Sequence, residues 1–225
     1  MNISDILKST METFLMVGIS TFLAYLVGLP LGVLLFVTGK NGLVKNKVVN
    51  QISGVIVNIL RSIPCLLLIV ILLPFNRMLI GIGTGEWYTI ILPLFVAAFP
   101  FVARLVEQSL NEINYGVIEA SRSLGASNFQ IITKVILVEA RPSLINGLAV
   151  AMVSIIGYTA FSYNIGAGGL IAKAYSYYTQ DPGHPWALRI WIIIIVIVVI
   201  VQIIQELGLF ISRKLDRRRK IWLNY

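Results

Sequence analysis

The sequence holds few of the residue types on which soluble enzymes rely. Charged residues make up only 12% of it, and it contains one cysteine, Cys65, and one histidine, His184. A lone cysteine excludes a disulfide within the chain, and one thiol with one imidazole leaves a metal site built on these groups short of ligands. His184 lies in a turn-forming stretch, Asp181 to Pro185, away from the serines of the apolar segments. We therefore expect no catalytic residues, no metal site and no enzymatic activity in this chain.

The sequence also lacks a nucleotide-binding motif. No G-x-x-x-x-G-K-[ST] segment occurs in it, so a P-loop is excluded. The stretch Gly166-Ala-Gly-Gly169 lacks the third glycine of a dinucleotide motif and follows an apolar segment, not a strand. A tight external turn, or a close approach to a docked protein, fits this stretch better. We expect the chain to hold no cofactor, so any use of ATP depends on a partner.

What the sequence does contain is long apolar segments. Hydrophobic residues make up 57% of it, and a helix needs about 20 apolar residues to cross a bilayer core. Five segments qualify: Phe14 to Val37, Val55 to Leu73, Ile90 to Ala103, Leu144 to Phe161 and Ile190 to Ile211. The second is interrupted at Arg61-Ser-Ile-Pro64. The sequence predicts an all-α, polytopic membrane protein with about five transmembrane helices, in a membrane domain over residues 14–211.

Lysine and arginine residues are concentrated in alternate loops. Three of the 18 fall in segments 1–13, 74–89 and 162–188, whereas thirteen fall in segments 38–54, 104–143 and 212–225. Because positively charged loops stay in the cytoplasm, we expect residues 1–13 to be extracytoplasmic and residues 212–225 to form a basic cytoplasmic tail. The net charge of +8 then reflects topology and attraction to anionic lipid headgroups. Nucleic acid is not an expected partner, since the charges form no basic and aromatic surface.

The cytoplasmic loop of about residues 105–142 carries an organised pattern. Residues 112–124 place apolar side chains at helical spacing, and Gly125 follows where a left-handed residue would end that helix. Ser127 and Gln130 fit a capping box that opens a second helix. The pattern predicts a helix-turn-helix that either docks a soluble partner or merely connects two spans. A DNA-binding unit fits less well, because spans on both sides tether the loop to the bilayer.

This loop resembles the EAA loop of ABC-importer permeases. The family pattern is E-A-A, three residues, G, nine residues and I-x-L-P, and the sequence has Glu119-Ala-Ser121, Gly125 and Val135-Ile-Leu137 at the same spacing. It departs from the pattern at Ser121, at Val135 and at Val138, which stands where the family has proline. Pro142 supplies a break four residues later.

Further segments resemble the methionine-transport permeases in order and spacing. These are Asn58 to Pro64, Pro74 to Arg77, Pro100 to Glu107, Gly157 to Ala160 and Gly166 to Leu170. The resemblance covers about Thr13 to Ile211. It implies a multi-pass permease in the plasma (cytoplasmic) membrane of a prokaryote, acting in an ATP-driven importer of methionine or a related small amino acid.

The resemblance also implies partners. A permease of this kind pairs with a second copy of itself, binds two ATPase subunits that hold ATP and magnesium, and receives substrate from an extracytoplasmic substrate-binding protein or lipoprotein. In this sequence the ATPase-coupling residues are expected at Glu119, Ala120, Ser121, Arg122, Leu124, Gly125 and Ala126.

Polar residues inside the spans mark a candidate translocation pathway, because each is costly in a bilayer. Ser154, Tyr158 and Ser162 recur every fourth residue and predict one stripe along the fourth span. The stripe faces either the pathway or neighbouring helices of the same subunit. Arg61 and Pro64 indicate either part of a gate or a kinked helix start with a snorkelling arginine.

Other functions remain open from the sequence alone. A permease for polar amino acids or another small solute is the main alternative. A secondary transporter would show repeated halves and ion ligands within the membrane, whereas no acidic residue falls in the middle of a span. A membrane scaffold without transport activity would need no organised cytoplasmic loop.

Overall fold

The computed structural model describes residues 2–40, 42–180 and 186–216. These residues form helices and turns, with no strand among them, so the all-α prediction is confirmed. The stretch around His184 and residues 217–225 of the expected tail over residues 212–225 lie outside the described residues.

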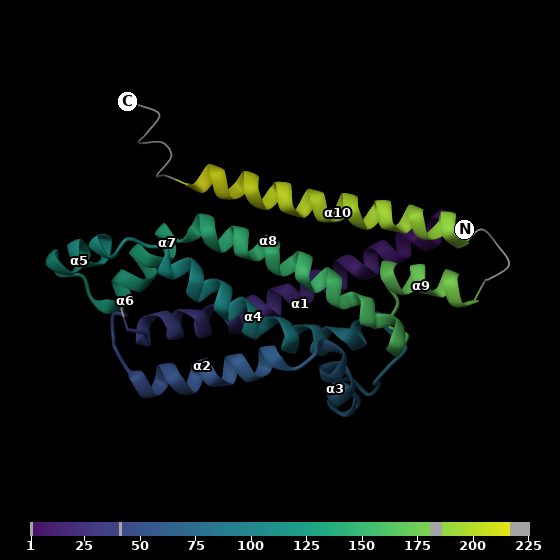
Figure 1. Ribbon diagram of the computed structural model, residues 1–225, viewed down its shortest axis with the longest axis horizontal. Coiled ribbons are helices and arrows are strands. Elements are labelled where there is room, and N and C mark those ends of the chain that lie inside the picture. The colour runs from purple at the N-terminus through teal and green to yellow at the C-terminus, as the bar shows by residue number, and fades with distance from the viewer. Residues whose placement is uncertain (1, 41, 181–185, 217–225) are drawn as a thin grey trace.

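Four helices are long and apolar enough to cross a membrane. They are α1 (Ile3–Thr38), α4 (Ile91–Asn111, preceded by a 3-10 turn over Trp87–Ile90), α8 (Arg141–Tyr158) and α10 (Trp186–Leu215). They run along the long axis of the molecule, and the start of α1 and the end of α10 lie at opposite ends (Figure 1). This is the arrangement that an odd number of crossings requires.

The expected second span is a broken pair of helices. α2 (Lys47–Ser62) and α3 (Cys65–Ile80) meet at an angle of 99°, so the segment predicted over Val55 to Leu73 is not one continuous helix. The cause is Pro64, which pushes the residue before it out of the helical region. Ile63 accordingly has an extended backbone, with φ −78° and ψ 122°. If the pair counts as one span, the total is five.

Several helices extend beyond their apolar segments. α1 begins at Ile3, so most of the segment 1–13 belongs to this helix, and α4 continues to Asn111 instead of ending near Ala103. Hydropathy did not detect these extensions, because the helix ends carry polar side chains and only the part of a helix that lies in lipid must be apolar. The described end of α10 similarly takes the fifth helix to Leu215.

Two helical units connect the long helices at opposite ends of the molecule. At the end reached by α10 lie α5 (Tyr115–Ser123), α6 (Asn128–Gln130), a π-helical segment (Ile131–Ile136) and α7 (Leu137–Glu139). At the other end a 3-10 helix (Thr159–Ile165) leads into α9 (Leu170–Gln180). The sequence does not predict α9, because its residues belong to the segment 162–188, which we expect to be an external loop.

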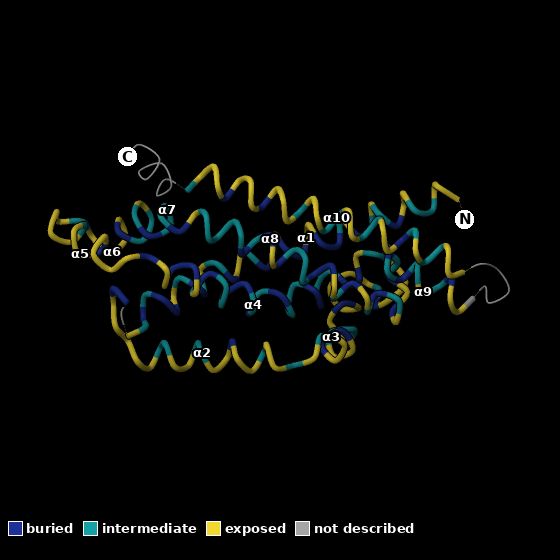
Figure 2. Tube along the Cα trace, turned by 45° about the horizontal axis from the view of Figure 1, so that its top comes forward, coloured by how far each residue is buried: buried dark blue, intermediate teal, exposed yellow. Residues whose placement is uncertain are grey.

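The core lies where α1, α4 and α8 pack together, and Figure 2 shows burial concentrated along these three helices. Glycines let α1 approach α4 closely, as small residues do at helix contacts in membranes. A Cβ on Gly28 would lie 2.8 Å from the Phe99 carbonyl oxygen, and one on Gly32 would lie 2.5 Å from that of Ala103. These two glycines therefore fix the crossing of α1 and α4.

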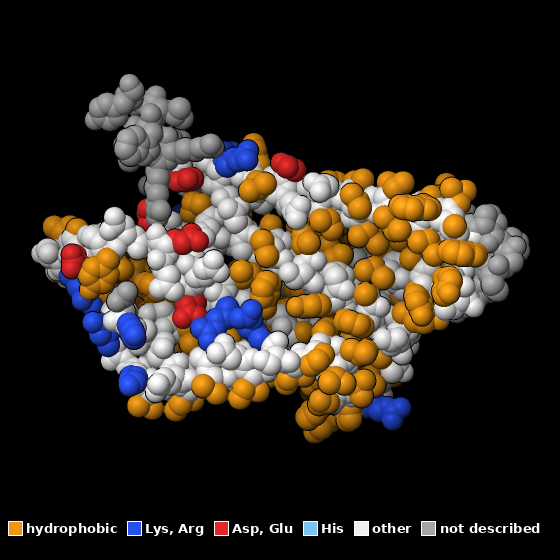
Figure 3. Space-filling view, in the orientation of Figure 1, with side chains coloured by type: hydrophobic (Ala, Val, Ile, Leu, Met, Phe, Trp, Pro, Cys, Tyr) orange, Lys and Arg blue, Asp and Glu red, His pale blue; other side chains and the backbone are white. Residues whose placement is uncertain are grey.

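Apolar side chains cover the part of the surface that faces away from the α5 end. Figure 3 shows them over α10, α3 and the outer edge of α2, whereas Lys, Arg, Asp and Glu gather toward the end that carries α5. A surface this apolar is the expected boundary with lipid or with another membrane-embedded subunit. The distribution of Lys and Arg predicts that the charged end is the cytoplasmic one.

Candidate functional site

The predicted glycine turn of the cytoplasmic loop is confirmed in detail. α5 ends with two hydrogen bonds, from Ala126 N to Ser121 O (3.2 Å) and from Gly125 N to Arg122 O (2.9 Å). Together they form a Schellman motif, in which the residue after the cap is left-handed. Gly125 has φ +79°, a value that a side chain makes costly. The turn therefore depends on a glycine at this position.

We call residues 115–130, which include α5, Gly125 and α6, the coupling knob. Its inner side is fixed to the rest of the molecule by one apolar and one polar contact. Ile118 is 2% exposed and belongs to the main core. Arg122 donates a hydrogen bond of 2.9 Å to the carbonyl oxygen of Leu43, in the loop between α1 and α2. The knob is thus held in place from the side of the membrane domain.

The outer side of the knob is open. Glu119, Ala120 and Gly125 are exposed, and the large apolar side chains of Leu124 and Phe129 are 88% and 74% exposed. Exposed apolar groups rimmed by polar ones mark protein interaction sites. The seven residues expected to meet a partner are therefore close together, although Ser121 and Ala126 are partly buried and Ser121 Oγ donates to Val117 O at 2.8 Å.

The second half of the cytoplasmic loop begins as the sequence predicted. Ser127 Oγ accepts from Gln130 N at 3.3 Å, and Gln130 Oε1 accepts from Ser127 N at 2.9 Å, which completes the capping box. The helix then widens into a π-helical segment instead of staying regular. Pro142 stands in the first turn of α8, where a missing N–H is tolerated, so it supplies the expected break.

Three of the five predicted pathway residues come together. Arg61 and Pro64, at the break between α2 and α3, line one pocket with Tyr158 at the end of α8. The pocket measures about 340 Å³, and Cys65 and Phe101 also line it. The guanidinium of Arg61 lies 6.0 Å from the centre of the Phe101 ring. Residues up to 97 positions apart thus share one cavity, which we call the break pocket.

The other two predicted pathway residues lie elsewhere. Ser154 Oγ donates to Val150 O within α8 at 2.9 Å. Ser162 is fully buried, and its hydroxyl donates to Gly168 O at 2.6 Å. The predicted stripe is broken because the chain after Tyr158 tightens to a 3-10 helix, whose three residues per turn rotate Ser162 away.

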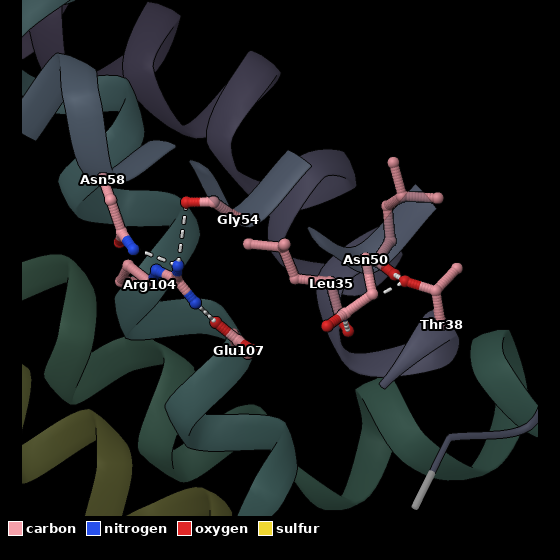
Figure 4. Close-up of polar contacts among 8 residues, drawn as sticks. Leu35, Thr38, Asn50, Gly54, Asn58, Arg104 and Glu107 are labelled. Carbon is pink, nitrogen blue, oxygen red and sulfur yellow. Dashed lines mark hydrogen bonds and ion pairs between the residues drawn. The ribbon is translucent and has the colours of Figure 1, made fainter. Parts of the chain in front are cut away.

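A polar network that the sequence did not single out joins α2 to α1 and α4 (Figure 4). Arg104 donates to Glu107 Oε2 at 2.6 Å, to Asn58 Oδ1 at 2.8 Å and to Gly54 O at 3.2 Å. Asn50 Nδ2 donates to Leu35 O at 2.7 Å. An arginine with an acid three residues later was the available signal. The network holds α2 from Asn50 to Asn58, and the end of this helix leads to the break pocket.

A second contact missed from the sequence closes the glycine stretch at the outer end. Glu12 Oε2 accepts from Gly169 N, and Thr13 Oγ1 accepts from Leu170 N, both at 2.9 Å. Gly166, Gly168 and Gly169 all have positive φ, so the predicted tight turn is confirmed. The residues that approach this turn closely are Glu12 and Thr13, which belong to α1 of the same chain. Within the ranges that the structure describes, no group of acidic, histidine or cysteine side chains could hold a metal ion.

A bundle of helices long enough to cross a membrane, with an exposed helical knob at one end and a polar pocket at a helix break, fits the membrane subunit of a transporter. The chain belongs to the family described as binding-protein-dependent transport system inner membrane components, which it matches over residues 28–214. It is therefore a multi-pass membrane protein and a permease.

Named relatives and solved structures agree with this family. The chain is 43% identical over 212 residues to the probable D-methionine transport system permease protein MetI of Pasteurella multocida, covering 93% of this chain and 95% of the relative. It is 42% identical over 155 residues to the corresponding protein of Escherichia coli K12, covering 69% and 71%.

Among solved structures, a chain of the inward-facing MetNI methionine ABC transporter matches with a TM-score of 0.90 and 37% identity, over 96% of this chain and 98% of that one. A chain from an amino acid ABC transporter crystallised with histidines matches with a TM-score of 0.74 at 17% identity, over 93% of each chain, which shows the fold alone.

Proposed function

We propose that this permease is the membrane-spanning subunit of an ATP-driven importer that takes up methionine or a related small amino acid. Two copies form the translocation pathway in the plasma membrane of a prokaryote. Two ATPase subunits bind at the cytoplasmic side and hold ATP and magnesium, while the permease carries no cofactor. An extracytoplasmic substrate-binding protein or lipoprotein delivers the substrate.

The observation that carries the proposal is the two-sided construction of the coupling knob. Its inner side is fixed by Ile118 and by the Arg122 hydrogen bond to Leu43, whereas Leu124 projects outward and is 88% exposed. A plain connector would have no reason to hold an apolar side chain away from the protein, since exposing it to water is unfavourable. A hydrophobic groove on a soluble ATPase would bury it.

The substrate class rests on the relatives and on the chemistry of the break pocket. The relatives named above are D-methionine transport permeases, and the pocket offers aromatic rings beside one guanidinium. This lining suits a small amino acid with an apolar side chain. Transport of polar amino acids is the second candidate, favoured by the hydroxyl of Tyr158 in the same pocket.

Two measurements test the proposal. The full chain, tagged and solubilised from its native membrane, should co-purify with an ATPase, and proteoliposomes holding both proteins and the binding protein should take up methionine only with ATP. Uptake without nucleotide, driven by an ion gradient, would instead support a secondary transporter. ATP-dependent uptake of labelled lysine, histidine or glutamine that unlabelled methionine does not inhibit would exchange the two substrate candidates.

A further inference from the structure

The break pocket combines groups from four helices. Arg61 comes from the last turn of α2, Cys65 begins α3, Phe101 lies in the middle of α4 and Tyr158 ends α8. Its volume of about 340 Å³ falls within the range of small-molecule sites. It therefore has both the size and the mixed polar and aromatic lining that a small amphipathic ligand requires.

Arg61 has no acidic partner among the described residues, although Arg104 on the neighbouring helix has one. Arg104 forms an ion pair with Glu107 at 2.6 Å, whereas the Arg61 guanidinium lies 6.0 Å from the centre of the Phe101 ring. An arginine within a membrane-spanning unit is costly unless it pairs or reaches water, and such residues commonly mark a substrate path. The pocket thus holds a positive charge that a negative ligand group would balance.

The start of α3 adds to this positive potential. Pro64 and Cys65 both line the pocket, and Pro64 as the cap residue offers no side-chain acceptor to the first amide groups of the helix. The amino end of a helix carries a partial positive charge. A broken helix whose amino end meets an anionic substrate group is a recurring device in transporters.

We propose that the break pocket is a substrate subsite, in which Arg61 binds the α-carboxylate of the amino acid and the rings of Phe101 and Tyr158 contact its side chain. A thioether side chain suits this lining, because sulfur makes favourable contacts with aromatic rings. The inference rests on the proposed function and adds the place and the chemistry of recognition within the permease. If Arg61 only snorkels toward lipid headgroups, no ligand carboxylate is recognised.

Cys65 provides a direct probe of this subsite, since it is the only cysteine of the chain and lines the pocket. We would measure the rate at which methyl methanethiosulfonate modifies Cys65, read as a mass shift of this chain, in the full transporter in membrane vesicles. Methionine should slow the reaction at least threefold. Methioninol, in which a hydroxymethyl group replaces the carboxylate, should protect at concentrations about tenfold higher, the ratio typical of losing a charge-assisted hydrogen bond.

Variants of the arginine sharpen the test. Arg61→Gln should raise the methionine concentration that gives half protection about tenfold and abolish the preference over methioninol, because a neutral amide replaces the charge. Arg61→Lys should keep part of that preference. Arg77→Gln is the matched control: this arginine also belongs to the broken pair, in the last turn of α3, but does not line the pocket, so protection should stay unchanged.

Two results would overturn the subsite. One is equal protection by methioninol and methionine in the unmodified chain, a comparison that requires no variant to fold. The other is absence of protection in vesicles that do take up methionine, which would leave the proposed function standing without this site. Absence of methionine uptake in the same vesicles, with Cys65 still protected by another amino acid through its carboxylate, would instead revise the substrate and keep the subsite.

Discussion

Gly125 in the coupling knob and Gly168 at the outer end have the same backbone conformation and opposite surroundings. Their φ angles are +79° and +75°. A Cβ on Gly125 would meet nothing within 4 Å, whereas one on Gly168 would lie 2.5 Å from Glu12 Oε2. Both turns require glycine for the backbone, but only the outer turn has its glycine enclosed by the same chain.

The difference separates a turn that completes the fold from a turn that serves a partner. The knob's turn is closed by bonds between residues 120 and 126, so it forms locally and leaves its outer surface free. The outer turn is closed by Glu12 and Thr13, 157 residues away in the sequence, and it ties α9 to α1. Substitutions in the outer turn should therefore change stability, and substitutions in the knob should change assembly.

The largest effect on stability is expected from Gly168→Ala. An alanine here must adopt a left-handed backbone, which costs about 1–2 kcal/mol. Its Cβ also overpacks against Glu12, which costs about 1–3 kcal/mol. We expect the free energy of unfolding in detergent to fall by about 2–5 kcal/mol, the total of these two ranges. Gly81→Ala is the control, because Gly81 has φ +79° and open space around it. Equal losses in the two variants would contradict the enclosed turn.

The second-largest loss in the free energy of unfolding is expected from Glu12→Ala. It leaves the buried amide of Gly169 without its acceptor, which costs about 1–3 kcal/mol. Lys8→Ala removes only the exposed ion pair with Glu12, whose atoms are 3.9 Å apart, and should leave stability nearly unchanged. Combined with Glu12→Ala, Gly168→Ala should cost less than it does alone, because the clashing carboxylate is gone. Strict additivity in this double-mutant cycle would show that Glu12 does not enclose the turn.

A smaller effect on stability, with a large effect on assembly, is expected at Gly125. Gly125→Ala and Gly125→Arg should each cost about 1–2 kcal/mol for the left-handed backbone, since neither side chain meets an obstacle in the chain itself. Only the arginine should block a docked ATPase, so co-purification and uptake should fall at least tenfold for Gly125→Arg and little for Gly125→Ala, a ratio that corresponds to about 1.4 kcal/mol of binding. Normal transport by Gly125→Arg would reduce the knob to a connector.

The smallest effect is expected from Ser127→Ala, which removes one half of the capping box. Loss of a cap acceptor costs about 1 kcal/mol, and thermal unfolding in detergent should register it. Ser123→Ala is a suitable control, because its hydroxyl donates only to Glu119 O within α5. A wild-type transition temperature for Ser127→Ala would mean that the capping box stabilises the protein no more than water does when it hydrogen-bonds to the same backbone amide.

The sequence predicted correctly those features that depend on residues only a few positions apart. Gly125 and the box of Ser127 and Gln130 were predicted correctly, because each motif needs only residues within a few positions. The bend at Pro64 was detected as an interruption, but its angle of 99° depends on packing that no local pattern contains. The sequence does not show that the stretch after Tyr158 forms a 3-10 helix, which takes Ser162 out of the predicted stripe.

The contacts that the sequence could not predict are long-range ones. Glu12 and Gly169 have no shared pattern, and an acid near the start of an apolar segment has an ordinary explanation at a membrane interface. α9 was missed because its apolar content is too low for a span and the glycines before it indicated a loop. Likewise, the convergence of Arg61 and Tyr158 on one pocket depends on how four helices are arranged.

The hydrogen bond from Arg122 to the carbonyl oxygen of Leu43 connects the knob to the membrane domain in addition to the covalent chain. The polypeptide itself joins α5 to α4 on one side and, through the capping box and the π-helical segment, to α8 on the other. Through Arg122, α5 is also connected to the loop between α1 and α2. We therefore expect a displacement of α5 to reach four helices. One of them, the 16-residue α2, connects this end of the molecule to the 99° bend at Pro64.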